Sequence, residues 1–398
     1  MKHIVKVLVI VISIFGNLFA IENSSWNFLN FSQDSKIPKF GIPSLDNLIF
    51  KKYSVSSSYQ EDAIVSNIVS DGVNLYFLDS KSNLIIFNLL ELKIINKIKL
   101  PNYTKKPIVG IALFEDYIYI SFENGNIIAF SLISNSISWE SNVIVPITSA
   151  PVVSNNKVII VAYNKVIALD KDSGKETWSA LGSKIGISAK KLNSPTIYDG
   201  YVWVGLFSSD ILVIKEENGN ILWRNNLLGS NLIGISPNPL IGDIKASILV
   251  DKNRALVVSN NKMSLYSSSD GKVLWSNSNV ASYNTPIIIN NLAYIVDVNG
   301  NAVQINLKNG SILWKKQLDT SKKIKEKVYW NHPLIVNNLI LLSSIFGDIL
   351  FLSPKNGSIV HQGQVYKGKG EKIYNAPIII QNKIIFLSSD GNLYISQN

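Results

Sequence analysis

Short runs of alternating apolar and polar residues, separated by Gly, Asn or Asp, fill most of the sequence. The runs "LAYIVDV" (292–298) and "NAVQINL" (301–307) are typical, and an Asn-Gly pair separates them. Alternation with a period of two predicts β-strands, whereas an amphipathic helix would repeat every 3.6 residues. Asn-Gly and Asp-Gly tolerate positive φ and favour tight hairpins. The pattern therefore predicts an all-β chain of short antiparallel strands.

A longer unit also recurs. Segments such as "ALDKDSGKETW" and "QINLKNGSILW" align without gaps, and their last positions are 43, 39, 45, 52, 39 and 47 residues apart. Each unit contains four strands, of which the first follows a Pro, as in "NTPII". Four strands in about 40–50 residues are typical of a β-propeller blade. The last positions are occupied by Asn96, Trp139, Trp178, Trp223, Trp275, Trp314 and His361.

The Trp side chains are expected to pack between neighbouring blades, with the ring buried and its N–H bonded to an acceptor. This structural role is favoured over ligand stacking because the residue recurs in most units. A long β-solenoid is the other architecture considered. The length of the units and their tight antiparallel hairpins argue against it.

The last unit is incomplete. It starts at "NAPII" (375–379) and ends with "DGNLYISQN" (390–398), so it has three strands. The segment "NLIFKKYSV" (47–55) resembles a fourth strand, with Phe50 at the Trp position, 46 residues before Asn96. Pairing this strand with the C-terminal unit would leave no open blade edge. We therefore predict an eight-bladed β-propeller over residues 46–398, closed by its N-terminal strand.

The first residues, "MKHIVKVLVIVISIFGNLFA", combine two Lys, an apolar run from Val7 to Phe15, and Ala20. This is the pattern of a secretory signal peptide. We predict a signal over residues 1–20 and an N-terminal extension over 21–45; an uncleaved anchor is the alternative. The sequence has no Cys, so we expect neither disulfides nor an N-terminal lipid-bearing Cys.

Composition supports a globular exported protein. Of 398 residues, 46% are hydrophobic and 17% charged, and the net charge is +10. A basic surface suits an anionic membrane or an acidic partner protein, although the abundance of Ile, Asn and Lys is also what biased base composition produces. The run "KKIKEK" (322–327) is better explained as a solvated loop than as a nucleic-acid site.

Residues for chemistry are scarce. His332 and His361 are the only His beyond His3, so a zinc site is not expected. No Gly-x-Ser-x-Gly motif occurs. The segment "GQVYKGKG" (363–370) imitates a phosphate-binding loop, but Gly370 stands where a Ser or Thr is needed. We predict no catalytic residue, no cofactor and no metal.

The repeat "ALDKDSGKETW" resembles those of quinoprotein-type eight-bladed propellers. With "GDIKAS" (242–247) and "VYWNHPLIVNNLILLSS" (328–344), the chain is similar to the BamB family. That resemblance implies a non-catalytic subunit of the β-barrel assembly machinery, in the periplasm and peripheral to the outer membrane. It implies binding to a POTRA domain of BamA, with nascent outer-membrane β-barrel chains as further partners.

The resemblance also implies where the partner binds. Two segments before successive units match the family's contact loops, and they place the contact at Ile187, Ala189, Lys190, Asp243 and Ile244. Two positions depart from the family pattern, because Ala189 replaces a larger apolar residue and Lys190 replaces Arg. Lys lacks the planar fork with which Arg binds carboxylates, so a weaker contact is expected.

Two other functions share this fold class. One is a quinone-dependent dehydrogenase, whose family uses a bound calcium and often an adjacent-Cys disulfide; the absence of Cys and the short loops here argue against it. The other is a periplasmic propeller that binds different partners. The fold does not distinguish these alternatives.

Overall fold

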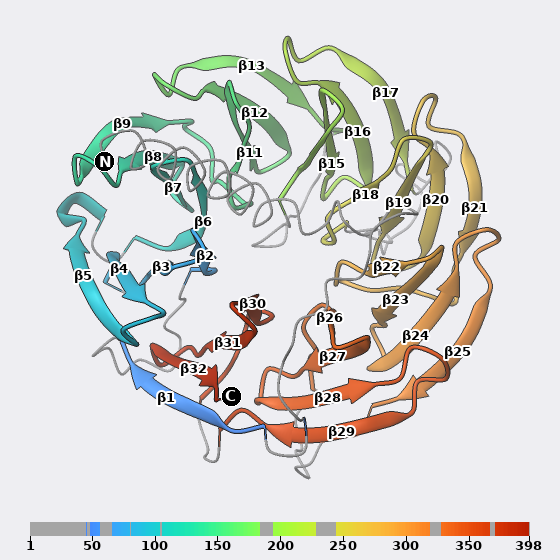
Figure 1. The fold of residues 1–398 in the computed structure, drawn as a ribbon. Coiled ribbons are helices and arrows are strands. Elements are labelled where there is room, and N and C mark those ends of the chain that lie inside the picture. Colours follow the sequence, from blue (N-terminus) through green and yellow to red (C-terminus); the bar gives the residue numbers. More distant parts are fainter. Residues whose placement is uncertain are drawn as a thin grey trace, which may run out of the picture.

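Eight four-stranded antiparallel sheets are arranged as blades around a central axis (Figure 1). The structure, a computed structural model, describes residues 45, 48–55, 66–79, 81–103, 106–183, 194–227, 244–318, 328–366 and 371–397. The predicted eight-bladed propeller is confirmed. The predicted signal peptide and almost all of the predicted extension (21–45) lie outside the described residues and remain predictions.

Blades are numbered from the sheet that starts at Val69. Blade 1 consists of β2 (Val69–Ser70), β3 (Asn74–Leu78), β4 (Asn83–Asn88) and β5 (Lys93–Lys99), and blade 2 of β6 (Ile108–Phe114), β7 (Tyr117–Phe122), β8 (Asn126–Ser131) and β9 (Ser136–Asn142). Blade 3 consists of β10 (Val152–Val153), β11 (Lys157–Ala162), β12 (Lys165–Asp170) and β13 (Glu176–Leu181), and blade 4 of β14 (Thr196–Tyr198), β15 (Tyr201–Gly205), β16 (Asp210–Lys215) and β17 (Ile221–Asn226).

Blade 5 consists of β18 (Leu249–Val250), β19 (Arg254–Val258), β20 (Met263–Ser267) and β21 (Val273–Asn277), and blade 6 of β22 (Ile287–Ile289), β23 (Leu292–Val296), β24 (Asn301–Asn306) and β25 (Ile312–Gln317). Blade 7 consists of β26 (Leu334–Val336), β27 (Leu339–Ser343), β28 (Asp348–Leu352) and β29 (Ile359–Gln364), and blade 8 of β30 (Ile378–Ile380), β31 (Lys383–Leu387), β32 (Asn392–Ser396) and β1 (Phe50–Ser54). A 3₁₀ turn, η2 (Pro101–Tyr103), follows blade 1. Among the described residues, no helix has both the length and the apolar character needed to cross a membrane.

The strand order fixes two faces of the ring. In each blade the first strand lies nearest the axis and the fourth lies on the rim (Figure 1). Because neighbouring strands are antiparallel, the connections between blades share one face with the turns between second and third strands. We call this the connection face. The turns between first and second and between third and fourth strands lie on the opposite face, which we call the turn face.

The core lies between the blades. The middle strands are buried on both faces, as β4 shows with all six residues buried. One apolar cluster, for example, joins Leu256 and Leu265 of blade 5 to Ile295 and Val303 of blade 6. A sheet packed on both sides needs apolar residues at successive positions, so the middle strands lose the alternation that the outer strands keep.

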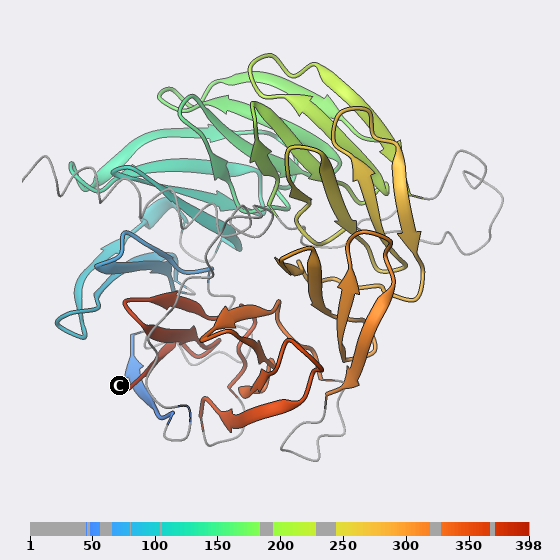
Figure 2. The same ribbon diagram turned by 45° about the vertical axis from the view of Figure 1, so that its right-hand side comes forward.

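The N-terminal strand closes the ring. β1 pairs antiparallel with β32, with Phe50 opposite Ser396 and Ser54 opposite Asn392. The blue strand β1 lies beside the red strand β32 in both views (Figures 1 and 2). Phe50 packs inside this blade, edge-on to Phe386 with ring centroids 5.4 Å apart. The predicted closure is therefore confirmed.

The outer strands of blades 1 to 7 each contain a β-bulge. In β13, Trp178 is opposite Ala168 and Glu176 is opposite Leu169, so Thr177 has no partner. The same shift occurs in the other six outer strands. The unpaired residues are Ile95, Ser138, Thr177, Leu222, Leu274, Leu313 and Val360. A bulge bends the edge and disrupts its hydrogen-bonding row.

Candidate partner-binding face

Each outer-strand Trp links its blade to the next. The indole N–H of Trp275 in blade 5 donates to the carbonyl of Leu307 in blade 6 at 2.8 Å. The Trp residues at the other four Trp-bearing positions make the same bond to the third-to-fourth-strand turn of the following blade. The pairs are Trp139 with Lys171, Trp178 with Glu216, Trp223 with Ser268, and Trp314 with Pro354, at 2.7, 2.7, 2.9 and 3.1 Å.

A Gly in that turn receives the Trp ring. A Cβ atom added at Gly310, whose φ is +73°, would lie 2.5 Å from Cε3 of Trp275. The same close approach joins Gly174 to Trp139, Gly219 to Trp178, Gly271 to Trp223, and Gly357 to Trp314. Only Gly combines a positive φ with this contact, so the Trp of one blade depends on the Gly of the next.

The three positions without Trp precede blades that offer no Gly in the third-to-fourth-strand turn. Phe50 and Asn96 precede blades whose turns have Leu92 and Asn135, not Gly, at positive φ. His361 precedes blade 8, where no turn joins the third strand to the fourth because the fourth is β1. His361 instead packs edge-on to Phe351 of its own blade, with ring centroids 5.8 Å apart. His332 lies in the connection before β26.

The described residues that flank both predicted contact segments lie at the connection face. The segments connect blades 3 and 4 and blades 4 and 5, respectively. Ile187, Ala189, Lys190 and Asp243 lie outside the described residues. Ile244 is described, and its side chain is only 1% exposed. It packs against Gly205, where an added Cβ would lie 2.1 Å from Cγ2 of Ile244. Ile244 therefore anchors its segment to the core and does not present its side chain to a partner.

Asp210 holds the ends of both contact segments. This carboxylate, 1% exposed, belongs to the first residue of β16, directly after the turn from β15. Its Oδ1 accepts hydrogen bonds from the Ser183 hydroxyl at 3.1 Å and the Asn226 amide at 2.9 Å, and Oδ2 accepts from the Ser183 backbone N–H. Ser183 directly precedes the first segment, and Asn226 ends the strand before the second. One buried carboxylate thus fixes two neighbouring connections on one face.

The protonation state of Asp210 suits this role. Burial raises the pKa of this carboxyl, but the hydrogen bonds from Ser183, Asn226 and Ser208 outweigh burial and hold its pKa below the ordinary value. Asp210 is therefore ionised at neutral pH, and both of its oxygens accept hydrogen bonds from these residues. Leu227 adds a further constraint, because its N–H donates to the Ser209 carbonyl at 3.0 Å and its carbonyl accepts from Lys262 Nζ at 2.8 Å.

Other blades use buried carboxylates in a similar way. Asp297 accepts from Asn301 and forms an ion pair with Lys315 of the outer strand at 2.8 Å. Asp79 is equally enclosed by Asn83 and Lys97. Their oxygens are occupied by the protein's own donors, so these carboxylates brace the blades. Within the described ranges, no group of three or more His, Asp or Glu side chains could hold a metal ion.

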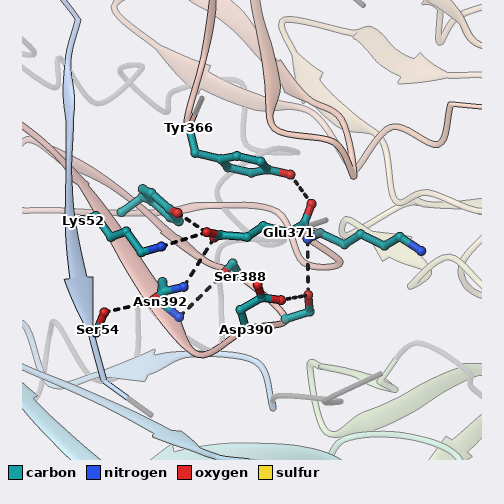
Figure 3. A network of polar contacts seen from close by, with 10 residues as sticks. Lys52, Ser54, Tyr366, Glu371, Ser388, Asp390 and Asn392 are labelled. Atoms are coloured by element: carbon teal, nitrogen blue, oxygen red, sulfur yellow. Dashed lines mark hydrogen bonds and ion pairs between the residues drawn. The ribbon is translucent and has the colours of Figure 1, made fainter. Parts of the chain in front are cut away.

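A second polar network lies at the closure (Figure 3). Glu371 receives Lys52 Nζ from β1 at 2.8 Å and the Tyr394 hydroxyl from β32. The Tyr366 hydroxyl donates to its backbone carbonyl. Burial raises the pKa of the Glu371 carboxyl, but the hydrogen bonds from Lys52 and Tyr394 outweigh burial and hold it below its ordinary value. Glu371 thus joins the N-terminal strand to the C-terminal strands.

Comparison with known proteins places the chain in a family. The profile described as outer membrane protein assembly factor BamB matches residues 99–316, more than half of the chain. The chain belongs to the BamB family. The matched residues include both contact segments and the Asp210 cluster.

Individual relatives agree with this assignment. An outer membrane protein assembly factor BamB from Moranella endobia is 25% identical over 212 residues, which are 52% of this chain and 53% of that protein. The chain thus matches about half the length of this BamB relative. The crystal structure of BamB from Moraxella catarrhalis superposes with a TM-score of 0.71 at 16% identity, covering 88% of this chain and all of that one.

The fold likeness extends to enzymes. Quinohemoprotein alcohol dehydrogenase from Comamonas testosteroni superposes with a TM-score of 0.65 at 11% identity, covering 95% of this chain and 79% of the enzyme. At such low identities a structural match shows the fold alone. Membership in the BamB family therefore rests on the sequence profile.

Sequence reasoning did not identify Asp210 or Glu371. Both act on residues far along the chain, 27 and 319 positions away in the case of Ser183 and Lys52. A weak signal existed, because an Asp stands at one end of several second-to-third-strand turns: before the turn in "DSKSN" (79–83) and "DVNGN" (297–301), and after it in "SSD" (208–210). The periodic Asp indicates a repeated structural role, but not which outer strands it holds.

Proposed function

We propose that the protein is a non-catalytic scaffold subunit of the β-barrel assembly machinery. It binds a POTRA domain of BamA through the segments 184–193 and 228–243 and aids the insertion of outer-membrane β-barrel proteins. It acts in the periplasm, at the periphery of the outer membrane. The observation that carries this proposal is the BamB family match over residues 99–316.

The geometry supports a docking role for the connection face. A partner that contacts both segments needs them held at a fixed separation, because ordering loops on binding costs affinity. Asp210 bonds to the residues at the start of both segments, and Ile244 anchors the end of the second in the core. Lys190 and Asp243 would then meet complementary charges on the partner.

The mechanism is positional. A closed ring in which five blade junctions are joined by Trp–Gly contacts is a rigid support, and the partner is held by loops at one face. The buried carboxylates brace this ring. Nascent β-barrel chains would be a further partner, brought close to the site of insertion by the complex as a whole.

The experiment is capture of the purified POTRA region of BamA. Lys190→Glu combined with Asp243→Lys should weaken the apparent Kd by at least about tenfold, about 1.4 kcal/mol. The control is Lys175→Glu with Asp172→Lys, which makes the same charge exchanges at exposed sites on the turn face. Both variants should keep the wild-type melting temperature. Unchanged capture by the first variant would remove these segments from the interface.

An assay addresses the enzymatic alternative, a quinone-dependent dehydrogenase, because such enzymes share the propeller fold. Pyrroloquinoline quinone and calcium are added to the protein, and the absorbance spectrum and dye reduction are recorded. The scaffold proposal expects neither a spectral shift nor activity. Dye reduction with an added alcohol would replace it with the redox function.

A further inference from the structure

Lysine residues are unevenly distributed around the rim. The outer strands and the turns that lead into them carry nine Lys and one acidic residue, Glu91, in blades 6, 7, 8 and 1. We call these strands and turns the basic rim. Its Lys are Lys308, Lys315, Lys316, Lys355, Lys51, Lys52, Lys93, Lys97 and Lys99.

The opposite half of the rim has a different balance. The corresponding strands and turns of blades 2 to 5 carry four basic and six acidic residues. These are Lys171, Lys175, Arg224, Lys272, Glu140, Asp172, Glu176, Glu216, Glu217 and Asp270. The positive charge of the rim is therefore concentrated on one side and does not simply reflect a Lys-rich composition.

Much of the charge on the basic rim is not neutralised locally. Lys52, Lys93, Lys97 and Lys315 form ion pairs with Glu371, Glu91, Asp79 and Asp297. Within the described part of the chain, the other five Lys have no acidic partner within ion-pair distance. All nine Lys residues are exposed. The excess positive charge therefore faces solvent.

Exposed aliphatic side chains accompany these Lys. Each blade of the basic rim contributes at least one: Leu313, Val360, Ile49 and Ile95, with exposed fractions of 51, 57, 64 and 47%, and Leu90 with 69%. Leu313, Val360 and Ile95 are the unpaired residues of the β-bulges. Each blade of the basic rim thus presents both basic and aliphatic side chains to solvent.

Two features argue against a β-strand of another protein as the partner of the basic rim. Bulges and Lys on an edge strand block the addition of another strand. The strands β25 and β5 have both features, and β29 has a bulge. Protein interfaces are also depleted in Lys and enriched in aromatic residues. No aromatic side chain of β25, β29, β1 or β5 belongs to the exposed class.

We propose that the basic rim, centred on blades 8 and 1, binds an anionic lipid surface. The Lys ammonium groups would meet lipid phosphates, and the aliphatic side chains would enter the interfacial layer, a combination that binds peripheral proteins to membranes. Because the rim curves (Figure 1), a flat bilayer meets adjoining blades. Blades 8 and 1 carry five of the nine Lys together with Ile49, Leu90 and Ile95.

This inference deepens the peripheral location in the proposed function but uses different residues. The basic rim lies along the outer strands, whereas the segments proposed to bind the POTRA domain are connections that link blade 3 to blade 4 and blade 4 to blade 5. The protein can therefore contact a membrane and a partner through separate surfaces, and each contact can be tested alone.

The test is co-sedimentation with vesicles of phosphatidylcholine containing 30% phosphatidylglycerol, compared with phosphatidylcholine alone. Wild-type protein should bind the anionic vesicles at about 50 mM salt and lose most binding at about 500 mM, because salt screens surface charges. Lys51→Glu with Lys99→Glu should reduce binding at least tenfold. The matched control, Lys175→Glu with Lys272→Glu on the other half of the rim, should stay within twofold of wild type.

Further measurements decide between outcomes. Ile49→Asn with Ile95→Asn should also weaken vesicle binding, whereas binding to soluble polyglutamate would not depend on these two residues. Absence of wild-type binding to anionic vesicles at low salt, or equal losses in both Lys variants, would overturn the inference. If Ile49→Asn with Ile95→Asn left vesicle binding unchanged, the result would overturn the inference and favour an acidic protein partner. POTRA capture by the Lys51→Glu, Lys99→Glu variant should remain intact, so failure here leaves the proposed function standing.

Discussion

The indole ring of Trp275 lies so close to Gly310 of the next blade that a methyl group on Gly310 would be 2.5 Å from Cε3 of the ring. The same relationship recurs at four other blade junctions. Blades of a propeller contact only their two neighbours, so these pairs are the repeated joints of the ring. They make specific predictions about stability.

Gly310→Ala should destabilise the protein more than Gly200→Ala. Both residues have nearly the same φ, +73° and +74°, but a Cβ at Gly200 meets no atom within 4 Å. Gly200→Ala therefore measures the cost of positive φ alone, about 1–2 kcal/mol. Gly310→Ala should cost about 1–3 kcal/mol more because of overpacking. Chemical unfolding measures both.

A double substitution isolates the contact. Combined with Trp275→Ala, Gly310→Ala should cost no more than Gly200→Ala, because the ring that it would strike is gone. An equal penalty in both backgrounds would show that the Trp ring is not what demands Gly at this position.

Deleting residues 393–398 should abolish the stability of the entire ring. The deletion removes most of β32, the strand between β31 and β1, so β1 loses its partner and blade 8 loses its centre. We expect a loss of the cooperative thermal transition. Deleting Gln397 and Asn398 alone removes one described backbone hydrogen bond, from Gln397 to Ile49, and should cost about 1 kcal/mol. An unchanged melting temperature for the longer deletion would contradict the closure.

Glu371→Gln should lower the free energy of unfolding by about 1–3 kcal/mol, because charged hydrogen bonds to Lys52 and Tyr394 are lost. Glu176→Gln is the control, since the Glu176 side chain is 42% exposed in its ion pair with Lys165 and the pair should contribute under about 1 kcal/mol.

The Glu371 contribution should depend on pH. The folded pKa of this carboxyl is lowered, so its stabilisation is present above the unfolded pKa of about 4.3 and is lost as pH falls through the folded value. The difference between wild type and Glu371→Gln should therefore be full at pH 7 and shrink below about pH 4. A difference that grows with acidity would show that Glu371 is not stabilised as the anion.

Asp210→Asn should loosen both contact segments. The carboxylate accepts from Ser183 Oγ and Asn226 through Oδ1 and from the Ser183 backbone N–H through Oδ2. The amide has one acceptor oxygen in place of two, so at least one of these donors loses its partner, at a cost of about 1–3 kcal/mol. Amide hydrogen exchange should accelerate at Ser183 and Leu227, and POTRA capture should weaken. The control is Asp199→Asn in the same blade, an exposed turn residue that should leave exchange and capture unchanged.

Local patterns were sufficient to predict the architecture. The alternation in "LAYIVDV" identifies strands, the spacing of the Trp positions identifies blades, and "NLIFKKYSV" identifies the closing strand. These features are encoded over a few residues or by simple repetition. The acceptors of the indole N–H groups were not predicted, because they depend on how neighbouring blades lie against each other.

The exceptions to the Trp pattern show what is missing from a single unit. His361 and Asn96 appear degenerate when each unit is considered alone. They are explained by the next blade, which lacks the turn in one case and lacks Gly in the other. The exact role of Asp210 was hidden for the same reason, since its partners belong to the ends of two different blades.

The seam between β1 and β32 also has a consequence for biogenesis. Ser54 and Asn392 are 338 positions apart, so a ribosome adding about 5–20 residues per second makes β1 tens of seconds before its partner. Until then the early strand has no edge to pair with, and the first seven blades form an open arc with exposed ends. Contacts so distant in sequence fold slowly. The protein should therefore rely on chaperones until its last strand is available, and the seam should be the step that commits it to the native state.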